Sequence, residues 1–126
     1  MKKILLICCL SVFSFVGAYS QQQNEQIREK MSEFIQKRMN LSKAEAEKFT
    51  PIFHRYFQDW RKTLNDNKND KLVLQQKVAE LRLKYRNEFK GVIGEKKSNE
   101  VYKQQEIFIK ELRQLKQQRD RRGKKF

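Results

Sequence analysis

The chain is short of the residues that build disulfides, turns and most catalytic centres. It has two cysteines, one proline, four glycines and one histidine among 126 residues. Both cysteines, Cys8 and Cys9, lie in an apolar N-terminal run, so neither a disulfide framework nor a thiolate site is expected beyond it. The one histidine, His54, has no second histidine with which to share a metal ion. Catalytic triads and glycine-rich phosphate loops are also missing. We therefore expect no enzyme, no cofactor and no metal site.

Residues 1–20 have the three parts of a secretory signal peptide. Two lysines precede a short apolar run, and Ala18 and Ser20 place small residues just before Gln21. The run is shorter than the roughly 20 apolar residues of a membrane-spanning helix. Lipidation of one of the two cysteines is the alternative, although no small residue precedes Cys8. We predict a cleavable signal peptide and a periplasmic protein, in which the remaining 106 of the 126 residues suit one domain.

Positive charge dominates the composition. Lysine and arginine number 29 against 15 acidic residues, a formal net charge of +14. Basic residues are densest at the end, where residues 119–126 are expected to form a basic disordered tail. Such a charge attracts acidic surfaces over a distance that salt shortens. For an exported chain these are acidic stretches of proteins or an anionic membrane surface, and nucleic acid is not an expected partner. A basic surface that serves only solubility is the other interpretation.

Helix formers fill the rest of the chain, and apolar residues recur at helical spacing over four segments. These segments cover about residues 24–39, 42–64, 71–93 and 95–119. Residues 81–86 alternate like a strand, but the helical period extends over the whole third segment. The heaviest apolar stripe lies on the second segment and consists of Phe49, Ile52, Phe53, Tyr56, Phe57, Trp60 and Leu64.

These patterns predict an all-α protein of about four helices, arranged as elongated helical hairpins over residues 21–118. A single core is marginal at this length, and long helices with narrow apolar seams often complete their burial by pairing. We therefore expect an antiparallel homodimer rather than a compact monomeric bundle. Pro51 lies two turns inside the second segment, where it removes a backbone hydrogen bond, so a kink or a break is expected there.

A short motif begins the second segment. Leu41-Ser42-Lys43-Ala44-Glu45 has the spacing of a capping box, in which Ser42 accepts from the backbone of Glu45 and Glu45 reaches back to Ser42. Leu41 stands just outside the helix, in the place of a hydrophobic staple.

With this motif, the layout resembles the Spy/CpxP-like family of periplasmic proteins, also called the LTXXQ-motif family. The resemblance covers most of residues 24–118 and includes short members described as sensors of extracytoplasmic sigma factors. Leu41, Ser42 and Glu45 stand where that family has Leu-Thr-x-x-Gln, and a second copy should fall near residues 93–97, where the match is poor. The resemblance implies a thin, curved helical homodimer whose basic, partly apolar surface holds unfolding proteins without ATP. Longer members of the family instead bind a sensor kinase.

We therefore predict an exported ATP-independent chaperone or envelope-stress protein that binds unfolded or acidic client proteins. Diffuse positive charge would speed their capture, and scattered apolar side chains would give a weak, adaptable grip. The alternatives are a regulatory partner of a membrane sensor or anti-sigma protein, and a helical protein bound to an anionic membrane surface. The candidate client or partner surface consists of off-stripe apolar residues and nearby cations, namely Leu72, Arg82, Leu83, Lys84, Arg86 and Ile107.

Overall fold

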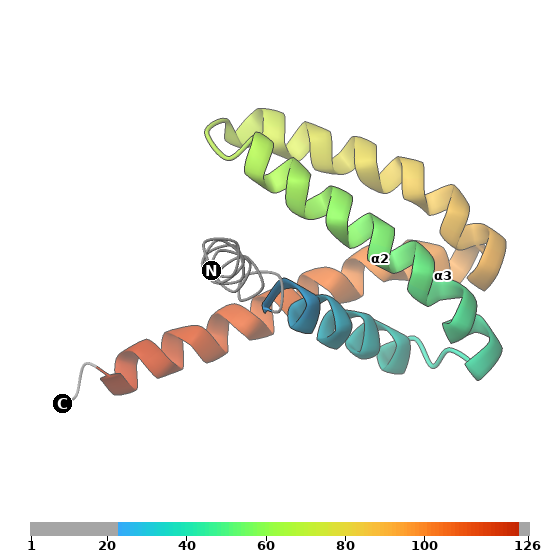
Figure 1. Ribbon diagram of the computed structural model, residues 1–126, viewed down its shortest axis with the longest axis horizontal. Coiled ribbons are helices and arrows are strands. Elements are labelled where there is room, and N and C mark those ends of the chain that lie inside the picture. Colours follow the sequence, from blue (N-terminus) through green and yellow to red (C-terminus); the bar gives the residue numbers. More distant parts are fainter. Residues whose placement is uncertain (1–22, 124–126) are drawn as a thin grey trace, which may run out of the picture. The chain divides into compact units, whose positions relative to one another are not determined.

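The computed structural model describes residues 23–123 of this chain. Three helices pack together, and no strand occurs in this range: residues 23–38, α2 (Lys43–Asp66) and α3 (Lys71–Gly123) (Figure 1). The predicted all-α class is confirmed. The signal peptide predicted for residues 1–20 lies outside the described residues. No helix within residues 23–123 combines the length and the hydropathy that crossing a membrane requires.

The chain divides into two compact units, Met1–Lys30 and Met31–Phe126. The described part of the first unit, residues 23–30, is helical. The second unit contains an aromatic core, in which Met31 and Ile35 of the first helix are buried together with one face of α2 and one face of α3.

The capping box predicted at the start of α2 is present. The Ser42 hydroxyl accepts from the Glu45 backbone N–H at 3.1 Å, and the Glu45 carboxylate accepts from the Ser42 N–H at 3.1 Å. The same carboxylate lies 3.1 Å from the ammonium of Lys97 in α3. The Ser42 N–H and the Lys97 ammonium together lower the pKa of Glu45. The cap of α2 is thereby also a tether to α3.

Pro51 does not break α2, so the break offered as one outcome is wrong. The helix runs from Lys43 to Asp66 with Pro51 inside it. Pro51 has no N–H to give to the carbonyl of Glu47, but both residues are exposed, so water can satisfy that carbonyl. The opposite face of the helix is packed into the core, which outweighs the lost bond.

The buried face of α2 is the aromatic stripe that the sequence predicts. Five of its members are buried, and several pack against aromatic rings of α3 in tilted or edge-to-face pairs, with centroid distances of 5.3 Å for Phe49–Phe89 and 5.5 Å for Tyr56–Tyr85. Each such ring pair contributes about 1 kcal/mol beyond the burial of its area. The buried residues from α2 are Phe49, Phe53, Tyr56, Phe57 and Trp60.

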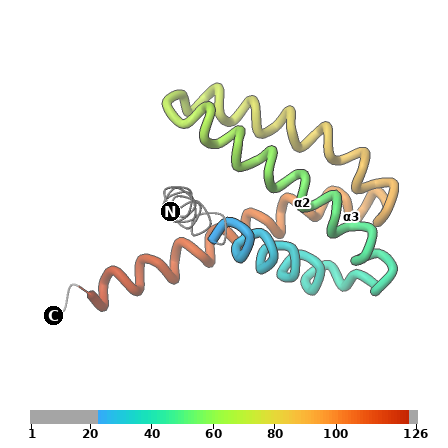
Figure 2. The backbone as a smooth tube through the Cα atoms, in the orientation of Figure 1, coloured from blue at the N-terminus to red at the C-terminus, as the bar shows by residue number. Residues whose placement is uncertain are grey.

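α3 consists of two helical parts that meet at Gly94. The backbone there is not helical, with φ 83° and ψ 168°, and the second part turns back along the first (Figure 2). The first part lies beside α2, which it follows after the turn at residues 67–70 (Figure 1). Only glycine adopts these angles without strain. The end of the third segment that the sequence predicts at residue 93 therefore coincides with this reversal.

The second part of α3 continues to Gly123, beyond the end predicted near Arg119. Helix-forming residues fill this stretch, and no turn residue interrupts it before Gly123. All side chains of residues 110–123 are exposed. The last three residues of the predicted tail lie outside the described range.

Replacing Gly94 by alanine is expected to lower the free energy of unfolding by about 1–3 kcal/mol, because alanine must adopt the positive φ. No atom lies within 4 Å of the added Cβ, so steric overlap contributes nothing. Gly91 is the matched control: it is helical with equally open surroundings, and Gly91→Ala should stabilise by up to about 1 kcal/mol. Urea unfolding followed by circular dichroism measures both. Equal shifts in the two variants would contradict the strain at Gly94.

Candidate functional site: a basic groove between the parts of α3

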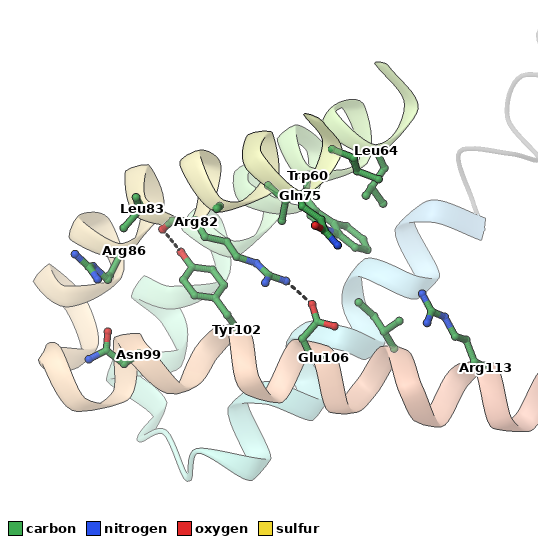
Figure 3. A pocket seen from close by; sticks show the side chains of 14 residues that line it. Trp60, Leu64, Gln75, Arg82, Leu83, Arg86, Asn99, Tyr102, Glu106 and Arg113 are labelled. Carbon is green, nitrogen blue, oxygen red and sulfur yellow. Dashed lines mark hydrogen bonds and ion pairs between the residues drawn. The ribbon is translucent and has the colours of Figure 1, made fainter. Parts of the chain in front are cut away.

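A groove of about 800 Å³ opens between the two parts of α3 and the C-terminal half of α2 (Figure 3). Its walls are mainly apolar, and three arginines and a single carboxylate lie among the lining residues. This volume is within the range of small-ligand sites, although the groove is open along its length. Its apolar walls include Trp60, Leu64, Leu74, Val78, Leu83 and Ile109.

Arg82 crosses the groove and joins its two sides. Its guanidinium lies 2.6 Å from the Glu106 carboxylate, and its Cζ atom is 5.2 Å from the centre of the Tyr102 ring (Figure 3). The Tyr102 hydroxyl donates to the backbone carbonyl of Arg82 at 2.6 Å. Burial opposes the charge of Arg82, but Tyr56 and Glu106 outweigh that cost and raise its pKa. Arg82 is therefore a strut that fixes the second part of α3 against the first.

Gln105 links Arg82 by hydrogen bonds to the aromatic core. The Gln105 side-chain oxygen accepts from the Tyr56 hydroxyl at 2.6 Å and from Arg82 at 3.2 Å. Because arginine can only donate, this oxygen must face Arg82, which fixes the orientation of the amide. The Gln105 Nε2 is then buried and has no hydrogen-bond partner among the described residues. Gln105 thus joins α2 and both parts of α3 at one point, while its Nε2 donor has no partner among the described residues.

Burial raises the pKa of the tyrosines around this point. The pKa of Tyr102 lies well above its ordinary value because of burial and the nearby Tyr56. Burial and a 2.6 Å hydrogen bond to Asp59 raise the pKa of Tyr85 to about 12. Both side chains are therefore neutral donors at physiological pH.

The structure brings together half of the predicted client surface. Arg82, Leu83 and Arg86 line the groove, and Leu83 is 55% exposed there. Lys84 lies over the ring of Tyr85, at a different depression of the surface. The remaining two, Leu72 and Ile107, do not line the groove.

Several groove residues were missed by the sequence reasoning. Glu106, Tyr102 and Arg113 come from the second part of α3, whose contacts depend on how the chain folds back. A signal did exist, since Arg82 and Glu106 stand at equal separations on either side of Gly94. A hairpin centred on that glycine places them opposite each other.

The groove can bind a ligand that combines apolar groups with negative charge. Within residues 23–123, no group of three or more histidine, cysteine or acidic residues could hold a metal ion. Leu41, Ser42 and Glu45 do not line the groove, and Ser42 and Glu45 cap α2.

Arg82→Ala is expected to lower the free energy of unfolding by about 2 kcal/mol, because it removes charged hydrogen bonds to Gln105 and Glu106. Lys84→Ala removes the same charge from an exposed position and should change stability by no more than about 0.5 kcal/mol. Urea midpoints for the two variants measure the difference. Arg82 would not be a strut if both variants unfolded at the wild-type urea concentration.

No protein-family model, curated protein or solved structure matches this chain. The resemblance to the Spy/CpxP-like family, based on the motif and the layout, therefore stays a prediction.

Proposed function

We propose that this protein is an exported, ATP-independent chaperone that holds unfolding proteins on its basic helical surface. The observation that supports this most is the open groove, with apolar walls and three arginines, of which only Arg82 is paired with a carboxylate of the groove. Unfolding proteins expose apolar side chains next to charged ones. A groove that offers both kinds of contact suits such segments better than it suits a compact small molecule.

Charge and apolar surface would act at different stages of binding. A net charge of +14, or +12 once Lys2 and Lys3 are removed with the signal peptide, attracts acidic clients from a distance and speeds their encounter. Leu83 and the groove walls would then supply short-range contacts, each worth little by itself. Release needs no nucleotide when the sum of such contacts is small.

An antiparallel homodimer is a further part of this proposal. Leu112 and Leu115 continue the apolar seam of α3 and are 43% and 57% exposed. Pairing with a second copy along this seam would cover them. The proposal also includes periplasmic localisation, which depends on the predicted signal peptide.

The test of chaperone activity is light scattering from a denatured acidic protein that refolds with the purified protein and without ATP. We expect suppressed aggregation at near-equimolar amounts, decreasing as salt rises from about 0.01 M to about 1 M, because the screening length falls from about 30 Å to about 3 Å. A basic client of similar size is the control and should be protected less. Absence of suppression at any salt concentration would overturn the proposal and favour the regulatory partner of a membrane sensor.

The test of the dimer is sedimentation of the wild type and of a variant in which Leu112 and Leu115 are both replaced by glutamate. We expect a dimer mass for the wild type and a monomer mass for the variant. Leu72→Glu is the control, since Leu72 is 78% exposed but lies outside the seam, and it should remain dimeric. A monomeric wild type would exclude the homodimer, while leaving the chaperone test unaffected.

A further inference from the structure

Two arginines on α3 lie one helical turn apart, and both line the groove, but their partners differ. Arg82 is engaged by Tyr56, Gln105 and Glu106. The Nε of Arg86 is buried and has no hydrogen-bond partner among the described residues. A buried donor left without an acceptor is energetically unfavourable. Because this Nε is enclosed, its unmade bond shows only that the protein places no acceptor beside Arg86, and a ligand in the groove would meet the terminal nitrogens of the guanidinium.

The surroundings of Arg86 provide no internal carboxylate for that donor. Asn99 and Tyr102 lie on the opposite side of the groove (Figure 3), and Tyr102 donates its hydroxyl to the backbone of Arg82. The one carboxylate among the groove-lining residues is Glu106, and it is bound to Arg82. Within residues 23–123, the groove lining therefore leaves no carboxylate for Arg86.

An apolar side chain accompanies the free cation. Leu83 precedes Arg86 by three residues, which places both on one face of the helix. Leu83 is more than half exposed although it lines the groove. A ligand that touches both residues needs a negative group next to an apolar one.

We propose that Arg86 is the anion-binding position of the groove and takes the carboxylate of an aspartate or glutamate in a bound, unfolded protein segment. A neighbouring apolar side chain of that segment lies against Leu83. Glu106 on Arg82 exemplifies the interaction, since it places a carboxylate on a guanidinium in the same groove at 2.6 Å. This inference rests on the proposed chaperone function and defines the segments that it recognises.

Lys84 is the control that distinguishes a specific site at Arg86 from diffuse electrostatic attraction. It lies two residues from Arg86 on the same helix, carries the same charge, and does not line the groove. If only the overall positive charge matters, loss of either cation weakens binding equally. If Arg86 receives the carboxylate, its loss alone has a large effect.

The experiment measures fluorescence anisotropy of a labelled, unstructured peptide in which leucine–glutamate pairs are separated by glycine and serine, and of the same peptide with glutamine for glutamate. Arg86→Gln should weaken binding of the glutamate peptide by about tenfold or more, since a hydrogen bond to a charged group is worth about 1.5–3 kcal/mol. Lys84→Gln should weaken it by less than about threefold. The glutamine peptide should bind wild type and Arg86→Gln equally.

Arg86→Lys is a second variant, which tests the inference even if Arg86→Gln perturbs the fold. Lysine retains the charge but lacks the planar guanidinium. A specific site at Arg86 therefore predicts weaker binding of the glutamate peptide to Arg86→Lys, whereas diffuse attraction predicts unchanged binding. Equal losses in Arg86→Gln and Lys84→Gln, or wild-type affinity in Arg86→Lys, would overturn the inference. If the peptides fail to bind while aggregation of the denatured client is still suppressed, the inference fails and the chaperone function stands. If both measurements fail, both proposals are wrong.

Discussion

Tyr56 packs against both parts of α3, and the groove depends on this contact. Its ring lies 5.5 Å from those of Tyr85 in the first part and Tyr102 in the second, and its hydroxyl binds Gln105. One side chain of α2 therefore holds together two helical parts that the backbone connects only through Gly94. The fully buried position of Tyr56 makes this junction part of the core, while the groove opens on its outer side.

The junction gives neighbouring cations different roles. Arg82 reaches the junction and is used to build it, whereas Arg86, one turn further along, is not. Lys84 points to a different surface. A basic run that looks uniform in sequence is thus divided by the period of the helix into a structural arginine, an unpaired arginine in the groove and a solvated lysine.

Local chemistry was predictable from the sequence, and long-range pairing was not. The cap at Ser42 and the buried face from Phe49 to Trp60 follow from spacing alone, because each depends on residues within a few turns. The break at Pro51 was wrong because core packing outweighs one lost bond at an exposed site. The groove depends on how far the chain turns at Gly94, and periodicity does not encode that angle.

The reversal at Gly94 has a mechanical consequence. A single residue with no side chain joins the two parts of α3, so the backbone places little restraint on the angle between them. That angle is held by the packing of Tyr56 against both parts and by the contacts of Arg82 and Tyr102 across the groove. The width of the groove is therefore set by these side-chain contacts rather than by the backbone at Gly94.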